Sequence, residues 1–136
     1  MQWDDSQNAG FTIGTPWKNV NDNYKEINVA LQDKNPNSVL NHFRKMVKLR
    51  KESEVLVYGD YQIIQQEHPD IYAYSRILDD EKMLVLLNFT DHNSSIIMSE
   101  KYNISQTLIN NYKTLIINDN SITLEPYQAV IVSLNE

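Results

Sequence analysis

Short apolar runs alternate with turn-forming residues from residue 55 to residue 136, and this pattern most narrows the fold. The runs are rich in Ile, Val, Leu and Tyr, and turn residues such as Gly59-Asp60 and Asn118-Asp119-Asn120 separate them. Many short strands at near-regular spacing are typical of an antiparallel sandwich or barrel. We therefore predict a mainly β fold here, an antiparallel β-sandwich. The expected strands are Val55–Tyr58, Tyr61–Gln65, Ile71–Ile77, Met83–Phe89, Ser95–Ser99, Thr107–Ile109, Thr114–Ile117, Ser121–Leu124 and Ala129–Leu134.

Residues 37–53 are predicted to form one helix. Asn37 and Ser38 follow Pro36, and both are good N-cap residues. Apolar side chains then recur at i, i+3, i+4 and i+7, which is the spacing of one helix face. Basic residues occupy the other face and the C-terminal half, where cations suit the helix dipole, and we interpret them as a solvated face. The apolar stripe is Val39, Leu40, Phe43, Met46 and Val47, and the basic residues are Arg44, Lys45, Lys48 and Lys51.

Residues 1–36 show no sustained period of 2 or 3.6 and are predicted to be an irregular loop. Their aromatic residues, Trp3, Phe11, Trp17 and Tyr24, argue against plain disorder, because disordered segments contain few aromatics. We expect a larger body to order this segment. The aromatics are then either a platform for sugar rings or packing residues against that body.

The composition excludes several classes of function. A net charge of −6 argues against a general nucleic-acid binder, which needs clustered Lys and Arg. With no cysteine, disulfides, thiol nucleophiles and thiolate metal sites are all absent. The N-terminus does not have the pattern of a signal peptide, and no apolar run is long enough to span a bilayer. We predict a soluble, cytoplasmic protein without nucleic-acid or membrane partners.

No catalytic or metal site is predicted within the chain. Asp79-Asp80-Glu81 is interpreted as a solvated turn, and Asp4-Asp5 as loop or cap acids. A calcium loop that would begin at Asp4 lacks the glycine and the bidentate glutamate that such loops need. The histidines have no paired ligand spacing, and we expect no cofactor. These histidines are His42, His68 and His92.

The first 61 residues carry a specific family resemblance. The run from Met1 to Phe11 resembles a stretch of the α-glucosidases in the α-amylase superfamily (glycoside hydrolase family 13), a group that includes oligo-1,6-glucosidases and trehalose-6-phosphate hydrolases. Asn88-Phe89 and residues 124–134 are compatible with this family. The resemblance continues at Gly14-Thr15-Pro16-Trp17, Val20-Asn21, Asn23-Tyr24, Ile27-Asn28-Val29, Lys48-Leu49-Arg50-Lys51 and Val55-Leu56-Val57-Tyr58-Gly59-Asp60-Tyr61.

The resemblance implies a C-terminal fragment of a longer hydrolase. Residues 1–54 would end its catalytic (β/α)8 barrel, with the last loop at 1–36 and the last helix at 37–53, and residues 55–136 would be the β domain. The catalytic acids would lie in earlier barrel strands, so the isolated chain is predicted to be inactive. Its partner would be the missing barrel, with an α-glucoside bound only in the full-length enzyme. The residues expected at the wall or rim of the substrate cleft are Gln2, Trp3, Phe11 and Trp17.

Two alternative functions remain at this point. The chain could be a free-standing carbohydrate-binding module that uses Trp3, Phe11 and Trp17. It could also be a structural partner of a separately encoded barrel. In every case the helix stripe would be exposed without a barrel, which favours self-association through that face or a mobile N-terminal third.

Overall fold

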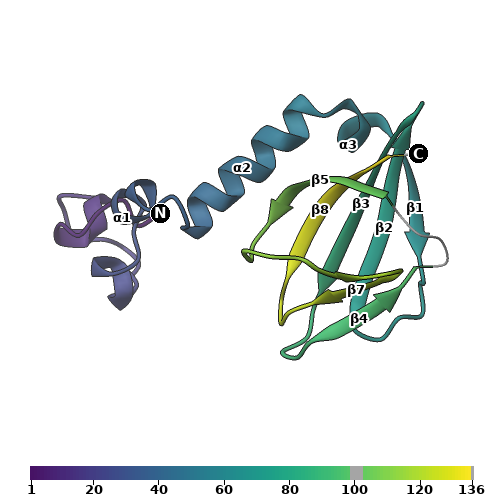
Figure 1. The fold of residues 1–136 in the computed structure, drawn as a ribbon. Helices are drawn as coiled ribbons and strands as arrows, with labels where there is room; N and C mark the ends of the chain where they lie inside the picture. The colour runs from purple at the N-terminus through teal and green to yellow at the C-terminus, as the bar shows by residue number, and fades with distance from the viewer. Residues whose placement is uncertain (99–102, 136) are drawn as a thin grey trace. The chain divides into compact units, whose positions relative to one another are not determined.

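The computed structural model describes residues 1–98 and 103–135, which form two compact units, Met1–Val47 and Lys48–Glu136 (Figure 1). The first unit holds short helical elements, and the second holds the sheets. No helix within the described ranges is long and apolar enough to cross a membrane.

The first unit contains two 3-10 helices, Gln7–Gly10 and Asp22–Lys25, and the α-helix α1, Val29–Lys34. The prediction of an irregular loop over residues 1–36 is therefore wrong for α1. A six-residue helix is too short to display a period, and a local cap and distant backbone groups hold its first turn instead. Asn28 Oδ1 accepts a hydrogen bond of 2.9 Å from the amide of Leu31, and the carbonyls of residues 2 and 3 accept from the amides of residues 29 and 30.

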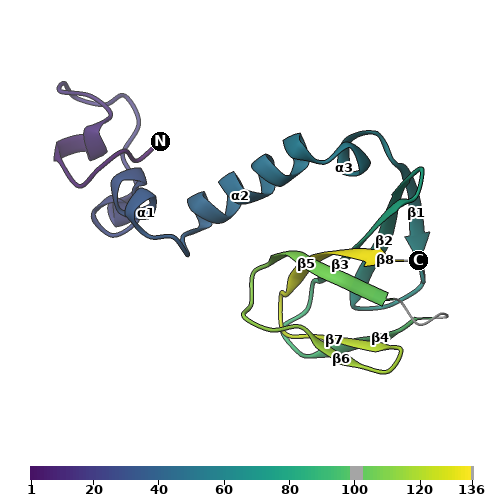
Figure 2. The ribbon, with the colours of Figure 1, turned by 45° about the horizontal axis from the view of Figure 1, so that its top comes forward.

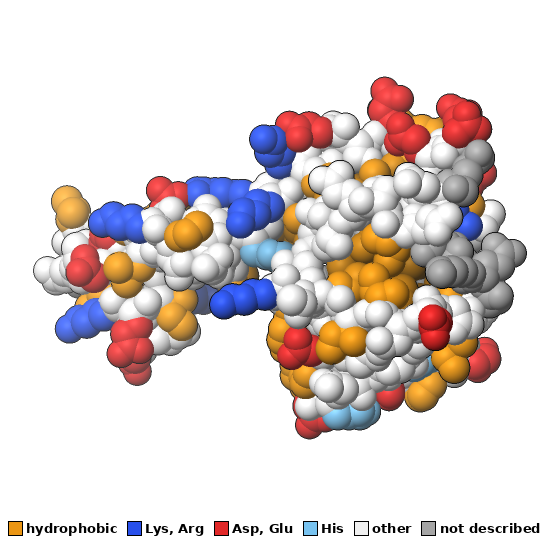
Figure 3. Space-filling model, in the orientation of Figure 1, with side chains coloured by type: hydrophobic (Ala, Val, Ile, Leu, Met, Phe, Trp, Pro, Cys, Tyr) orange, Lys and Arg blue, Asp and Glu red, His pale blue; other side chains and the backbone are white. Residues whose placement is uncertain are grey.

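The predicted helix is present as α2, Val39–Glu52. Ser38 acts as its N-cap, because its Oγ accepts from the amide of Asn41 at 3.2 Å. The expected exposure of the apolar stripe is confirmed for Val39, Phe43 and Met46, but Leu40 and Val47 of the same stripe are half-buried. In the space-filling view, lysine and arginine side chains gather over this helix (Figure 3).

Residues 55–58 are not a strand, as the sequence pattern predicted, but part of a short helix, α3, Glu54–Tyr58. The Oγ of Ser53 accepts from the amide of Leu56 at 3.3 Å and caps this helix. Val55 and Leu56 are buried. The cap and this burial outweigh the preference of Val-Leu-Val-Tyr for strand structure, because β propensity depends strongly on context.

The second unit is an antiparallel β-sandwich, which confirms the predicted fold class. A five-stranded sheet has the order β1-β2-β3-β8-β5 and faces a three-stranded sheet with the order β4-β7-β6 (Figures 1 and 2). Every strand pair is antiparallel. The eight remaining predicted strands all correspond to observed ones, although Ser99 lies outside the described residues. The strands are β1 Asp60–Ile64, β2 Ile71–Leu78, β3 Glu81–Asn88, β4 Ser94–Ile97, β5 Asn103–Asn110, β6 Ile116–Asn118, β7 Ser121–Leu124 and β8 Ala129–Asn135.

The hydrophobic core lies between the two sheets. Along β2, the odd-numbered residues 71, 73 and 75 are buried while residues 72, 74 and 76 are exposed or half-buried, as expected for a strand with one face on a core. Of the expected turn at residues 79–81, residues 79 and 80 join β2 to β3, whereas Glu81 already begins β3; Asp79 adopts a left-handed backbone, with φ 51°. The core cluster is Ile71, Ala73, Leu84, Leu86, Ile96, Met98, Ile122, Leu124, Val130, Val132 and Leu134.

Candidate functional site

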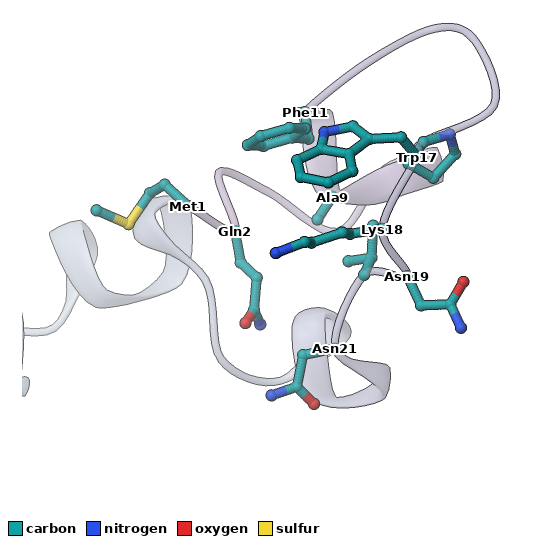
Figure 4. A pocket seen from close by; sticks show the side chains of 10 residues that line it. Met1, Gln2, Ala9, Phe11, Trp17, Lys18, Asn19 and Asn21 are labelled. Atoms are coloured by element: carbon teal, nitrogen blue, oxygen red, sulfur yellow. The ribbon is translucent and has the colours of Figure 1, made fainter.

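The first unit contains a pocket of about 280 Å³ (Figure 4). It brings together three of the four residues that the sequence predicted for a substrate cleft, namely Gln2, Phe11 and Trp17. Trp3 is half-exposed but does not line the pocket. The complete lining is Met1, Gln2, Ala9, Phe11, Pro16, Trp17, Lys18, Asn19, Val20 and Asn21.

A run of left-handed backbone shapes the loop beside the pocket. Asn8, Ala9 and Gly10 have φ values of 56°, 55° and 65°, a conformation that is costly for residues with a Cβ atom. The Nδ2 group of Asn8 donates to the carbonyls of Thr12 at 3.0 Å and Gly14 at 2.9 Å, which stabilises the turn. Ala9 is buried at the centre of this turn. These contacts define the backbone turn that immediately precedes Phe11.

The carboxylate of Asp4 closes the same turn from the other side. It accepts hydrogen bonds from the hydroxyl of Ser6 and from the Ser6 amide, the latter at 2.9 Å. These two bonds lower the pKa of Asp4 below its ordinary value. A Cβ atom on Gly10 would lie only 2.8 Å from this carboxylate, and the left-handed φ of 65° also favours glycine at this position. Asp4 is therefore an ionised structural group and is unsuited to act as a general acid.

Gln2 holds two distant parts of the loop together. Its Nε2 donates to Asn23 Oδ1 at 3.0 Å and to the carbonyl of Ile27 at 2.6 Å. Both amide hydrogens are thus engaged, and only the Oε1 atom can accept a hydrogen bond from a ligand. Gln2 consequently links residues 23 and 27 to the start of the chain, and it could act toward a ligand only as a hydrogen-bond acceptor.

The aromatic rings give the pocket an open apolar border. Trp17 is 86% exposed and Phe11 is 58% exposed. The Nζ of Lys18 lies 4.7 Å from the centre of the Trp17 ring, a cation–π distance. Exposed aromatic rings, one cation and side-chain amides together suit a neutral or polar ligand whose ring carries many hydroxyl groups.

Sequence reasoning missed Lys18, Asn19 and Asn21 as pocket residues. The available signal was their position next to Trp17 in an Asn-rich segment. Since an irregular loop has no fixed side-chain direction, no periodicity indicates which of its polar groups face inward.

A histidine with two neighbouring carboxylates lies in the second unit. His92 lies between two carboxylates, with Nε2 at 3.5 Å from Asp70 Oδ2 and Nδ1 at 3.3 Å from Asp91 Oδ1. The hydrogen bond with Asp91 is the main cause that raises the pKa of His92 above 6.5. Exposed ion pairs of this kind contribute little to stability. Within the described ranges, no group of three His, Cys, Asp or Glu side chains is arranged to hold a metal ion.

Comparisons with known proteins divide the chain into two parts. The catalytic-domain model of alpha amylase matches residues 1–59, and the model of the alpha-amylase SusG C-terminal domain matches residues 71–131. The oligo-1,6-glucosidase of Bacillus cereus is 43% identical over 136 residues, which is 98% of this chain and 24% of that protein. The trehalose-6-phosphate hydrolase of Bacillus subtilis is 33% identical over all of this chain and 25% of its own length.

Solved structures agree with this assignment. An isomaltulose synthase mutant from Erwinia rhapontici in complex with sucrose superposes with a TM-score of 0.90 at 42% identity, covering 99% of this chain and 24% of that chain. Trehalose-6-phosphate hydrolase from Bacillus licheniformis gives a TM-score of 0.90 at 38% identity, over 99% of this chain and 25% of that chain. This chain belongs to the α-amylase family of glycoside hydrolases and spans about a quarter of the length of the relatives that it matches.

Proposed function

We propose that this chain is the last part of the catalytic barrel, with the trailing β domain, of an α-glucosidase-type hydrolase that acts on short α-glucosides in carbohydrate metabolism. Residues 1–54 would contribute the last loop and helix of the barrel, and residues 55–136 the β domain that stabilises it. Identity of 41–43% to two oligo-1,6-glucosidases over 98% of the chain supports this proposal. The cytoplasm is the proposed location.

The observation that carries the proposal is an apolar helix face within the part that matches the catalytic domain. Val39 is 81% exposed, Phe43 61% and Met46 44% on α2. Large apolar side chains at helical spacing are normally covered by another element. We infer that the rest of the barrel covers them in the intact enzyme and that the same face mediates self-association without it.

The pocket would form part of the wall or rim of the substrate cleft. Phe11 and Trp17 would offer ring faces to the apolar side of a sugar, while Gln2 would accept a hydrogen bond from a hydroxyl group. Trp3 would support this wall through its backbone contact with α1. Retaining glycosidases use two carboxyl groups about 5 Å apart, and we assign both to the barrel outside this chain.

Activity measurements with and without a barrel test this function. We expect the isolated chain to leave maltose, isomaltose and an aryl α-glucoside intact. Mixing it with a separately produced catalytic part of the Bacillus cereus relative should restore cleavage, and Phe43→Glu should reduce the recovery. Cleavage by the isolated chain that a point substitution within it abolishes would disprove the proposal.

A carbohydrate-binding module is the second candidate, favoured by the exposed aromatic pocket. It predicts that maltooligosaccharides bind the isolated chain and that Trp17→Ala removes the binding. Ile13→Ala is the matched control, because Ile13 is fully exposed but does not line the pocket. Flat calorimetric titrations at millimolar sugar would exclude this candidate.

A further inference from the structure

The five-stranded sheet buries apolar side chains on both of its faces. Its inner face supplies the core between the sheets. Val55, Leu56 and Val85 are also buried, at 0%, 7% and 3% exposure, yet they lie outside that core cluster. Val85 of β3 pairs with Tyr74 of β2, and both belong to the outer face of this sheet. A second apolar contact therefore exists on the outer face, where α3 packs against β2 and β3.

Arginine side chains fix α3 on this outer face. The guanidinium of Arg76 donates to the carbonyls of Val55 at 3.5 Å and Val57 at 3.3 Å. Arg50, near the end of α2, donates to the carbonyl of Leu56 at 2.6 Å. These carbonyls belong to a helix only five residues long, whose C-terminal acceptors need partners from elsewhere. The helix is thus tied to the sheet at the end of the face where Arg76 lies.

Beside α3, the part of the outer face that β1 and β2 form is apolar and aromatic and is largely uncovered. Tyr61 is 47% exposed, Ile63 40% and Tyr72 41%. The ring centroids of Tyr61 and Tyr74 are 5.2 Å apart, those of Tyr72 and Tyr74 are 5.6 Å apart, and the hydroxyls of Tyr61 and Tyr72 share a hydrogen bond of 2.6 Å. Mutual contact holds the rings in place, so the surface is preorganised for a partner. We call Tyr61, Ile63, Tyr72 and Tyr74 the tyrosine face.

The outer face of the three-stranded sheet is more polar. Ser95 of β4 and Thr123 of β7 are cross-strand partners there, and their hydroxyls share a hydrogen bond of 2.8 Å. Ile97 of β4 is exposed on the same face. Hydroxyl groups of this kind stay hydrated without cost, whereas a cluster of exposed rings does not. The tyrosine face and the outer face of the three-stranded sheet therefore differ in their need for a partner.

We propose that the tyrosine face is a docking surface for the catalytic domain of the same enzyme. The match to the catalytic-domain model extends to residue 59 and therefore includes α3, which packs against β2 and β3 on this face. The tyrosine face continues that contact along β1 and β2 without a break. This inference rests on the proposed function, because it takes the missing barrel as the occupant and adds a second contact surface to the α2 stripe.

Thiol labelling can test this surface, because the chain has no cysteine of its own. Ile63→Cys places a thiol on the tyrosine face, on edge strand β1. Ile97→Cys is the matched control, since β4 is also an edge strand and Ile97 is also an exposed isoleucine. Phe43→Cys reports on the α2 stripe. Each variant is labelled alone and after fusion to the catalytic part of the Bacillus cereus relative, and mass spectrometry of peptides gives the rate at each site.

The expected result is that fusion slows labelling of the Ile63→Cys variant by at least about ten-fold and leaves the Ile97→Cys variant within about two-fold. Equal rates at Ile63→Cys in both forms, with Phe43→Cys protected, would overturn this inference and leave the proposed function intact. Equal slowing at Ile97→Cys would overturn it too, because the protection would not be specific to one face. If fusion slowed labelling at neither Ile63→Cys nor Phe43→Cys, the proposed function would be overturned as well.

Two further measurements test whether the fusion is folded and whether a second copy of the chain occupies the tyrosine face. Cleavage of an aryl α-glucoside shows whether the fusion is folded. If it is not, cysteines at the aligned positions of the intact Bacillus cereus relative provide the same comparison, and free reaction at the position aligned with Ile63 overturns the inference. Sedimentation of the isolated chain tests a second copy as the occupant, because dissociation of a dimer by Ile63→Glu would assign the face to self-association instead.

Discussion

Each of the two units of this chain is stabilised internally by a different kind of interaction. In residues 1–47, all of which the structure describes, Ala9 is the single buried apolar side chain. The second unit buries a continuous apolar cluster between two sheets. The first unit relies instead on side-chain amides, caps and left-handed backbone, as in the contacts of Gln2, Asn8 and Asn28.

Under the proposed function, this difference assigns stability to the second unit and contact with the substrate to the first. A buried core supplies the free energy that keeps the second unit folded. A hydrogen-bonded loop can hold Phe11 and Trp17 at its surface without burying them, which a binding wall requires. Under the proposed function, the exposed rings and the exposed α2 stripe of the first unit would pack against the rest of the barrel or face its substrate cleft.

The largest difference between the units should appear in core truncations. Leu86 is fully buried in the core cluster, so Leu86→Ala should lower the free energy of unfolding by about 2–5 kcal/mol. Ile13→Ala, at a fully exposed residue of the first unit, should change it by less than about 0.5 kcal/mol. Urea denaturation followed by circular dichroism measures both. Similar losses from the two substitutions would mean that the units do not differ as described.

A smaller effect is expected from the polar network at one end of the sandwich. Asn88 is 4% exposed, and its amide donates to the carbonyls of His92 at 2.8 Å and Glu125 at 2.9 Å, while its Oδ1 accepts from the Thr90 amide at 2.9 Å. Asn88→Ala leaves these backbone groups without a partner and should cost about 1–3 kcal/mol in the same denaturation experiment. Asn118→Ala, in an exposed position, is the control and should be nearly neutral.

In the first unit, glycine substitutions should separate loop shape from overall stability. Gly10→Ala forces a Cβ against the Asp4 carboxylate in a left-handed conformation and should strain the loop by about 1–3 kcal/mol. Gly14→Ala meets nothing closer than 3.8 Å and is the matched control. The Trp17 indole signal in NMR and the rate of limited proteolysis report on the loop. An unchanged indole signal in Gly10→Ala would show that the left-handed turn does not position Trp17.

The smallest effect concerns pH in the second unit. Hydrogen bonding to Asp91 is the main cause that raises the pKa of His92, and Asp70 adds to it. A raised pKa means that the charged histidine stabilises the folded state below pH 6.5, and that this contribution is lost as the pH rises through the folded-state pKa. NMR titration of His92 should show the raised pKa, and Asp91→Asn should lower it. The control Asp119→Asn should leave it unchanged, and a shift in that variant would point to general electrostatics rather than the Asp91 contact.

Sequence patterns predicted the second unit well because strand periodicity and turn residues report directly on a two-layer core. The failure at residues 55–58 is instructive. Their composition favours a strand, but Ser53 caps a helix there and the outer face of the sheet buries Val55 and Leu56. That outcome depends on β2 and β3, which follow in the chain, and no local pattern contains this information.

Residues 1–61 by themselves determined the family, because their side-chain identities match those of the relatives across irregular structure. The sequence also predicted Gln2, Phe11 and Trp17 as candidate site residues, which the structure brings to one pocket. Only the tertiary structure decided that Trp3 stays outside it, that Lys18 lies against Trp17, and that a tyrosine face continues from α3. Such contacts join segments far apart in the chain through register and loop closure, and local residue patterns do not encode them.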